Sequence, residues 1–308
     1  MTSGILILKK PSGPSSSGVL GPVKRALKTR KVGHSGTLDP FASGVMIVLV
    51  GTATRTARWF TGLDKEYRGI VQFGSQTDTL DREGVVVSQA PLPDALTVTA
   101  VLPSFIGAIQ QIPPAYSALK IQGRRAYEIA RAGGTPQVPT RTVTIHSLSM
   151  NPLDDAPQGR WQLSVTCGSG TYVRALARDI AAAAGTVGYL QELERRSVGP
   201  FLLDQAVSLE ELQDDPDPLQ LIHPVGPALR SLGIFDELIV QGDRLRAVQT
   251  GRPLSGVLPE PEAEGRDTLV LDPAGTVYAV LRFAEGRWRY EVVLKPLEHN
   301  GDAPPPLG

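Results

Sequence analysis

The chain has 308 residues, of which 41 % are hydrophobic and 20 % charged, and its 31 basic residues balance 31 acidic ones. This composition excludes a disordered or collagen-like chain, and the length predicts two domains with ample residues for a core. A net charge of zero would argue against a nucleic-acid-binding protein only if the charges were evenly spread, because a polyanion responds to local charge.

The cysteine and histidine content excludes several kinds of site. Cys167 is the only cysteine, so the chain has no intrachain disulfide and no cysteine-rich metal site. The four histidines are far apart and none has the HExxH spacing of a zinc protease, so we expect no metal. The apolar run Ile5–Leu8 is too short for a signal sequence or a membrane span. We therefore expect a cytoplasmic protein.

The first quarter of the chain predicts two buried strands with a basic helix between them. The apolar runs Ile5–Lys9 and Val45–Val50 are typical of strands, the second of a strand buried on both faces. In the intervening helix, apolar residues recur at i, i+4 and i+8 from Val19 to Leu27. Ser15–Ser17 supplies candidate N-caps for this helix.

Alternating helices and strands follow as far as residue 234. Helices are expected at 52–62, 95–106, 127–132 and 175–184, and strands at 67–73, 85–87, 141–149, 161–167 and 193–198. Several of these strands are placed to pair antiparallel. The order therefore predicts an α+β fold, with a mixed, mainly antiparallel sheet flanked by helices.

The last part of the chain has a different character from about residue 235. Its apolar segments are short and are separated by Gly, Pro and Asp, at 239, 243–250, 268–272, 276–283 and 288–294. Five such pieces predict a small β-barrel or sandwich of about 60 residues. We therefore divide the chain into a main domain at 1–234, a small β domain at 235–300 and a disordered tail at 301–308.

The charges are unevenly distributed along the sequence. Residues 1–75 contain eleven basic and three acidic residues, a net charge of +8, whereas residues 204–217 contain six acidic residues and no basic one. A second basic group consists of Lys120, Arg124, Arg125, Arg131 and Arg141, opposed only by Glu128. These groups are either solvated surfaces or surfaces that bind the phosphates of a nucleic acid.

One acidic residue lies in a glycine-bracketed loop within the basic quarter. Pro40 restricts Asp39 to extended backbone conformations, which hold the carboxylate away from any helix. The simple interpretation is a turn. A carboxylate here would repel phosphate, however, so a nucleophile or an acid–base group is the functional interpretation.

Further motifs could supply partners for this carboxylate. Tyr172 and Arg174 are two residues apart, so in an extended segment their side chains point the same way. A guanidinium near a carboxylate keeps it ionised and orients it through two hydrogen bonds, although a surface ion pair is the alternative. Tyr67 is a core residue or a stacking platform for a base. The spacing of Asp78 and Asp81 fits no EF-hand loop, so we expect a capped turn there.

Taken together, these motifs resemble the TruB family of tRNA pseudouridine synthases. The seven matching segments occur in family order, at Lys10–Ser16, Gly33–Pro40, Lys65–Tyr67, Thr77–Asp81, Pro113–Lys120, Tyr172–Arg174 and Leu193–Arg195. They cover about residues 5–201. The region after about 235 resembles the small PUA-like RNA-binding domain of the family.

The resemblance implies the pseudouridine synthase fold and an isomerase that converts uridine 55 in the T loop of tRNA to pseudouridine. The base is flipped into a pocket, and neither a cofactor nor a metal takes part. Asp39 is implied as the catalytic nucleophile, Arg174 as its ion-pair partner and Tyr172 as a hydrogen-bonding neighbour. The partner is the T stem-loop of tRNA, and we expect a monomer.

The resemblance also implies residues that bind the substrate. Tyr67 would stack on the extruded uracil, Leu193 would close its other face and His34 would hold the opened RNA loop. Arg195 and Lys10 receive supporting roles in substrate binding. Two alternatives stay open: a non-catalytic RNA-binding or tRNA-folding module, and the same chemistry on another stem-loop RNA. Whether Asp39 attacks the uracil ring or the ribose carbon also stays open, as does the identity of the general base.

Overall fold

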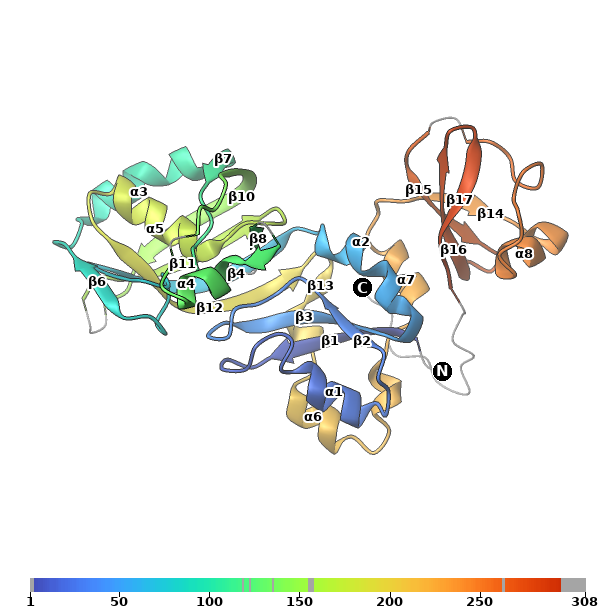
Figure 1. Cartoon of the computed structure of the whole chain (residues 1–308), viewed down its shortest axis with the longest axis horizontal. Coiled ribbons are helices and arrows are strands. Elements are labelled where there is room, and N and C mark those ends of the chain that lie inside the picture. Colours follow the sequence, from blue (N-terminus) through green and yellow to red (C-terminus); the bar gives the residue numbers. More distant parts are fainter. Residues whose placement is uncertain are drawn as a thin grey trace.

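The protein is described by a computed structural model that covers residues 3–294, except 118, 122, 135, 155–157 and 262–263. The tail at 301–308 and the end of the small β domain, 295–300, lie outside the described residues. Figure 1 shows an elongated molecule in which a large curved sheet is followed by a smaller sheet near one end. Within the described residues, no helix is long and apolar enough to cross a membrane.

The large sheet is mixed and mainly antiparallel, as predicted. Its strands follow the order β1 (Gly4–Lys10), β3 (Ser43–Val50), β12 (Gly188–Val198), β4 (Lys65–Phe73), β11 (Arg160–Cys167), β10 (Arg141–Pro152) and β7 (Gly107–Gln111), with β2 (Val32–Ser35) beside β3 and β13 (Phe201–Leu202) beside β12. Among the described strands of this sheet, parallel pairing joins only β3 to β12, over two residue pairs. At this short junction the two halves of the sheet meet.

The junction requires a glycine on β3. A Cβ atom on Gly44 would lie 2.2 Å from the carbonyl oxygen of Arg195, and the residue has φ +109°. A side chain at this position would therefore hold β3 and β12 apart, because the atoms that it would meet belong to the backbone of Arg195 and cannot turn aside.

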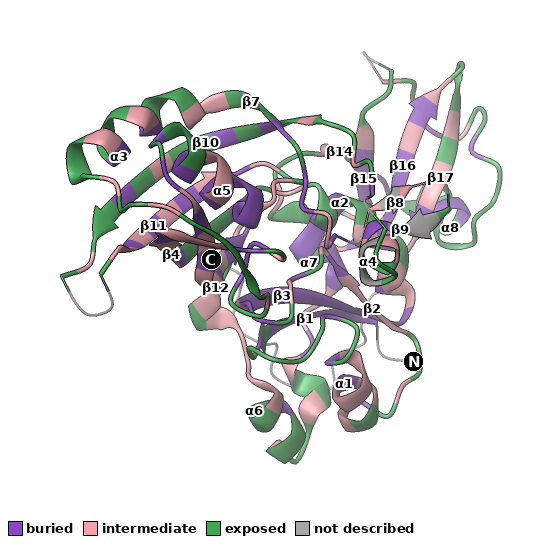
Figure 2. Ribbon diagram, turned by 60° about the vertical axis from the view of Figure 1, so that its left-hand side comes forward, coloured by how far each residue is buried: buried purple, intermediate pink, exposed green. Residues whose placement is uncertain are grey.

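Strand β3 is buried on both faces, which explains its unbroken apolar sequence. Val45, Ile47 and Leu49 contribute to one core cluster and Met46, Val48 and Val50 to another. Figure 2 shows β1 and β3 coloured as buried along most of their length. Helices α1 (Leu20–Ala26) and α6 (Leu209–Asp214) contact each other on one face of this half of the sheet, and α2 (Ala57–Thr61) and α7 (Val225–Arg230) belong to the core cluster on its other face.

The other half of the sheet packs against the alanine-rich helix α5 (Val173–Ala183). Its small side chains Ala175, Ala177 and Ala181 are fully buried, which lets the helix approach the sheet closely. The remaining elements of this half are β5 (Ser75–Thr77), β6 (Val86–Gln89), α3 (Ala95–Val101), β8 (Lys120–Ile121), β9 (Arg124–Arg125) and α4 (Ala126–Arg131).

Two local predictions in the first quarter were wrong in detail. Helix α1 begins at Leu20, and its N-cap position, Val19, has no side-chain cap. Of the serines expected as caps, Ser15 accepts from the amide of Gly18 at 3.0 Å in the turn before the helix, whereas Ser16 bonds to a distant loop. Ser16 Oγ donates to the carbonyl oxygen of Leu38 and accepts from the amide of Leu38, both at 2.8 Å. The helix expected at 52–62 is a 3₁₀ helix over Gly51–Thr56 followed by the single turn of α2.

The smaller sheet contains four of the five predicted segments. Its order is β14 (Asp236–Ile239), β15 (Asp267–Leu271), β16 (Val277–Ala284) and β17 (Arg287–Val293), and β14 pairs parallel with β15. The fifth segment is not a strand but helix α8 (Gly242–Gln249), whose Leu245 and Val248 are spaced for one helical face. The division of the chain at residue 235 stays a prediction.

A half-buried carboxylate connects the small sheet to helix α2. Asp267 on β15 accepts a hydrogen bond from Trp59 Nε1 at 2.8 Å and two from Arg282, at 2.8 and 3.0 Å, while Arg58 lies 3.3 Å away. Trp59 also packs edge-on against Phe235. Apolar residues of α7 and of the small sheet belong to one core cluster, so the two sheets are packed as one unit.

Asp267→Asn is expected to lower the free energy of unfolding by about 1–2 kcal/mol, because it weakens two arginine contacts and removes the negative charge from the acceptor of the buried Trp59 indole. Urea unfolding measures this loss. Asp236→Asn is the matched control: its pair with Arg266 is solvent-exposed, and its loss should stay below about 0.5 kcal/mol. Equal losses in the two variants would contradict the role assigned to Asp267.

Candidate active site

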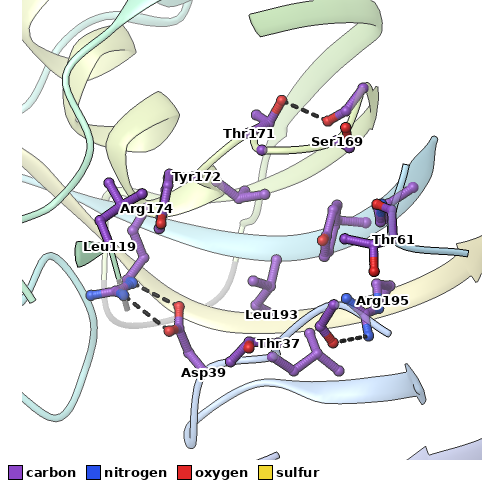
Figure 3. A pocket seen from close by; sticks show the side chains of 17 residues that line it. Thr37, Asp39, Thr61, Leu119, Ser169, Thr171, Tyr172, Arg174, Leu193 and Arg195 are labelled. Atoms are coloured by element: carbon purple, nitrogen blue, oxygen red, sulfur yellow. Dashed lines mark hydrogen bonds and ion pairs between the residues drawn. The ribbon is translucent and has the colours of Figure 1, made fainter. Parts of the chain in front are cut away.

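A cavity of about 440 Å³ opens where the two halves of the large sheet meet. Its walls come from the loop between β2 and β3, from the start of β4, from the turn before α5 and from β12. Figure 3 shows Asp39 and Arg174 at one end of this cavity, Arg195 and Thr61 at the other, and Leu193 between them. The cavity thus collects residues from most of the motifs singled out in the sequence.

The loop that carries Asp39 is held by two side chains that do not line the cavity. Ser16 holds the backbone of Leu38 through the two bonds described above. Lys10 Nζ donates to three carbonyl oxygens, those of Pro11, Pro14 and Pro40, at 2.7, 2.8 and 3.2 Å. Because an ammonium has three N–H groups, Lys10 has no further donor to offer. The structure therefore places it beneath the loop and not among the residues that line the cavity.

Arg174 uses its entire guanidinium to hold this site together. Nε and Nη2 donate to the two carboxylate oxygens of Asp39 at 2.8 and 3.0 Å. Nη2 also donates to the carbonyl oxygen of Tyr116 at 3.0 Å, and Nη1 to that of Thr79 at 2.7 Å. Asp81 Oδ2 lies 3.2 Å from Nη1. The guanidinium thus makes four hydrogen bonds and one further ion-pair contact, and Asp39, with a third of its side chain exposed, is fixed at the cavity wall.

Asp81 is a site residue that the sequence did not identify. The expected capped turn is confirmed, since Asp81 Oδ1 accepts from Thr79 Oγ1 at 2.7 Å and from the amide of Glu83 at 3.0 Å. Its other oxygen faces Arg174, and its side chain is 7 % exposed. No local pattern could have revealed this pair, because the two residues are far apart in the sequence.

Tyr172 and Arg174 reach the cavity differently from what the sequence predicted. They do not share an extended segment: Tyr172 occupies the N-cap position of α5, and Arg174 lies in the first turn of the helix. Gln111, fully buried, holds the backbone of Tyr172 by accepting from its amide at 2.8 Å and donating to its carbonyl at 3.2 Å. The Arg141 guanidinium lies 5.7 Å from the centre of the Tyr172 ring. The pKa of Tyr172 is raised, chiefly by burial.

Tyr67 and Leu193 form the apolar part of the cavity. They lie on neighbouring strands, where Tyr67 pairs with Arg195 and Leu193 pairs with Gly69. A Cβ atom on Gly69 would come within 2.6 Å of the carbonyl oxygen of Glu192, so this position has no room for a side chain. Burial raises the pKa of Tyr67, against the opposing positive charge of Arg195.

Two buried cations lie at the end of the cavity away from Asp39. Lys65 Nζ donates to the carbonyl oxygens of Thr61 and Leu63, and burial, followed by the charge of Arg195, lowers its pKa to about 8. Arg195 is 1 % exposed, and its Nε donates to the carbonyl oxygen of Val45 at 2.7 Å. Both side chains line the cavity.

His34 lies on β2, outside the cavity lining. Its pKa is lowered by burial and by the charge of Arg195, and its Nδ1 is buried without a hydrogen-bond partner in the described part of the chain. Of the residues singled out in the sequence, the cavity brings together Asp39, Tyr67, Tyr172, Arg174, Leu193 and Arg195, but not His34 and Lys10. Among the described residues, no group of three or more His, Cys, Asp or Glu side chains could hold a metal ion.

Comparison with known proteins places these features in a family. Residues 24–173 match the model of the TruB family pseudouridylate synthase N-terminal domain. The tRNA pseudouridine synthase B of Novosphingobium aromaticivorans is 40 % identical over 265 residues, which cover 83 % of this chain and 87 % of that protein. The protein of the same name from Arthrobacter sp. is 36 % identical and covers 96 % of this chain and 98 % of its own.

Solved structures share the same fold at lower sequence identity. A chain in the crystal structure of a Cbf5–Nop10–Gar1 complex superposes with a TM-score of 0.70 at 22 % identity, covering 95 % of this chain and 84 % of that one. A chain in an H/ACA RNP bound to a substrate RNA containing 2'-deoxyuridine has a TM-score of 0.67 at 20 % identity, covering 99 % and 88 %.

Lys10 and Lys65 are expected to make the protein more stable as the pH rises from about 7.5 to about 9. Burial lowers the pKa of each to about 8, whereas in the unfolded chain they hold their protons to about pH 10.4. The unfolded chain therefore binds more protons in this window, and each lysine should add about 1 kcal/mol to the free energy of unfolding.

Urea unfolding across this pH window measures the slope. Lys10→Met should remove the part of the pH dependence of stability that Lys10 contributes. Lys9→Met, at the exposed neighbouring position, should leave the dependence of the free energy of unfolding on pH unchanged. A Lys10→Met variant with the slope of the original protein would show that Lys10 does not titrate as a buried group.

Proposed function

The chain belongs to the TruB family of pseudouridine synthases and is therefore an isomerase, and on this premise we propose that it converts uridine 55 in the T loop of tRNA to pseudouridine. The predicted pseudouridine synthase fold is confirmed. One observation supports the assignment of the site above the others: Asp39, held through both oxygens by the buried Arg174, faces a cavity with an aromatic and an aliphatic wall.

We propose that the target base occupies this cavity after leaving the RNA stack. Atoms of a stacked base are inaccessible, so the nucleotide must be flipped out before it reacts. A volume of about 440 Å³ lies in the range of small-molecule pockets. Tyr67 would stack on one face of the uracil and Leu193 would close the other. These contacts suit a planar ring and leave its edges free to meet polar groups.

Asp39 acts as the nucleophile in this proposal. If a carboxylate oxygen attacks the ribose C1', the C1'–N1 bond breaks and its electron pair leaves with the uracil. The base turns, its C5 attacks C1', and the carboxylate departs with the electron pair of its own bond. C5 then loses its proton and N1 gains one, which gives an isomer of the starting nucleoside. Attack at the uracil C6 is the other route. In both, Arg174 positions the carboxylate and does not touch the substrate.

The contacts to the rest of the RNA are proposals of the same kind. We assign the T stem-loop to the basic groups of the first quarter and of residues 120–141, with His34 beside the opened loop. The small domain, 235–300, is proposed to be PUA-like and to contact RNA. We propose that the protein acts on tRNA as a monomer in the cytoplasm.

Asp39→Asn is expected to reduce pseudouridine formation on unmodified tRNA by at least about 10³-fold, because an amide cannot replace the nucleophilic carboxylate. Its dissociation constant for tRNA should stay within about threefold of the original. Asp214→Asn, at an exposed position outside the small domain and both basic groups, is the control and should retain full turnover. Normal turnover in Asp39→Asn would overturn the assignment of the nucleophile. Tight tRNA binding without any product in the original protein would instead favour the non-catalytic alternative.

Mapping pseudouridine in total RNA from cells with and without the gene identifies the substrate. We expect the signal that disappears to be the T-loop uridine of tRNAs, because recognition should rest on loop shape and unstacked bases. A lost signal in another stem-loop RNA, with the T loop unchanged, would support the alternative substrate.

A further inference from the structure

The two arginines of the cavity differ in how many of their donors are used. Arg174 donates four hydrogen bonds to protein acceptors, two of them on the Asp39 carboxylate, and Asp81 Oδ2 lies 3.2 Å from its Nη1. Arg195 has three partners, all neutral: Val45 O at 2.7 Å from Nε, Gly36 O at 3.5 Å from Nη2 and the hydroxyl group of Tyr67. In the part of the chain that the structure describes, no carboxylate forms an ion pair with Arg195. The five N–H groups of Arg195 therefore outnumber its three partners, and none of these partners carries a negative charge.

An unpaired cation of this kind is costly to bury. Arg195 is 1 % exposed, and a buried charge normally requires a charged partner or a complete set of hydrogen bonds. Its neighbour Lys65 is also a cation, so the two repel each other. The positive charge of Arg195 contributes to the lowered pKa values of Lys65 and His34. A ligand that brings negative charge to this end of the cavity would relieve the imbalance.

The position of Arg195 identifies which part of a substrate it meets. Figure 3 shows Arg195 across the cavity from the Asp39–Arg174 pair, with Leu193 between them. Tyr67 is the direct cross-strand partner of Arg195. A base lying against Tyr67 and Leu193 with its reacting bond near Asp39 would therefore direct its far edge toward Arg195. In uracil that edge carries a carbonyl oxygen.

We propose that Arg195 is a catalytic residue that stabilises the negative charge that develops on the uracil as Asp39 reacts. The proposal rests on the function proposed above, and it holds for both routes of attack. When C1' is attacked, the electron pair of the broken C1'–N1 bond spreads over N1 and the two carbonyl oxygens. When C6 is attacked, the electron pair of the C5–C6 double bond moves to C5 and O4. A fixed donor aimed at charge that appears only during reaction accelerates the chemical step without tightening substrate binding.

A phosphate of the RNA backbone is the other anion that Arg195 could bind. The surroundings favour the base, because Arg195 is almost inaccessible and is approached past Tyr67 and Leu193, which suit a ring. A contact to a phosphate and a contact to the base would affect different measurable quantities. A phosphate contact affects the dissociation constant and its dependence on salt, whereas a contact to the departing base affects the rate of bond cleavage.

The test compares two target nucleotides in single-turnover cleavage of the N-glycosidic bond. RNA carries either uridine or 5-fluorouridine at the target position, since fluorine withdraws electrons and makes the uracil anion more stable. Arg195→Met should slow cleavage of uridine by about 10²–10³-fold and that of 5-fluorouridine by at least about tenfold less. The dissociation constant should stay within about threefold. Arg195→Lys, which keeps the charge, should recover part of the rate.

The neighbouring Arg196→Met is the matched control, because Arg196 pairs with Glu194 and is 40 % exposed. It should cleave both substrates at the original rate. Equal losses on uridine and 5-fluorouridine in both Arg195 variants would overturn the proposal and leave Arg195 a structural role. A change confined to the dissociation constant and its salt dependence would assign the residue to a phosphate instead.

Discussion

Arg174 donates to Asp39, to the turn at Thr79 and Asp81, and to the carbonyl of Tyr116, so one buried guanidinium joins three segments that are distant in the sequence. Each of these acceptors is needed, because a buried N–H group without a partner costs about 1–3 kcal/mol. A shift of any one segment therefore disturbs the others. The carboxylate that faces the cavity is held by this shared constraint and not by its own loop alone, and its geometry is set before RNA arrives.

Part of the positive charge of the first quarter of the sequence is buried or paired in the fold. Lys10 and Lys65 are buried, and their ammonium groups donate to backbone carbonyl oxygens of nearby segments. Arg58 pairs with Asp267 and Glu291 of the small sheet. Helix α1, which carries Lys24 and Arg25, contacts the acidic helix α6. The net charge of +8 thus overstates the positive surface available to RNA, and the acidic segment lies where it offsets part of it.

Sequence patterns identified the elements whose burial is regular. The unbroken apolar run of β3 and the alternation of β4 both indicate which faces are covered, and the motif residues Asp39, Tyr67, Tyr172, Arg174, Leu193 and Arg195 do meet in one cavity. Features that depend on distant partners could not be read in this way. Asp81 contacts Arg174 and Gln111 bonds to the backbone of Tyr172 only once the chain has folded. The same holds for the lack of a carboxylate beside Arg195 in the described part of the chain. Segment 243–250 was mistaken for a strand because it is short and bounded by turn residues, while its apolar spacing is helical.

The shared core beneath the two sheets has a consequence for which RNAs can be accepted. Trp59, Asp267 and the apolar residues of α7 fix the small sheet against the large one, so the distance from its surface to the cavity does not adapt to the ligand. An RNA that touches both must already present its target nucleotide at that separation. Selection by length and bend then precedes any reading of sequence, and a rigid, prefolded RNA loses less conformational entropy in meeting it than a flexible one does.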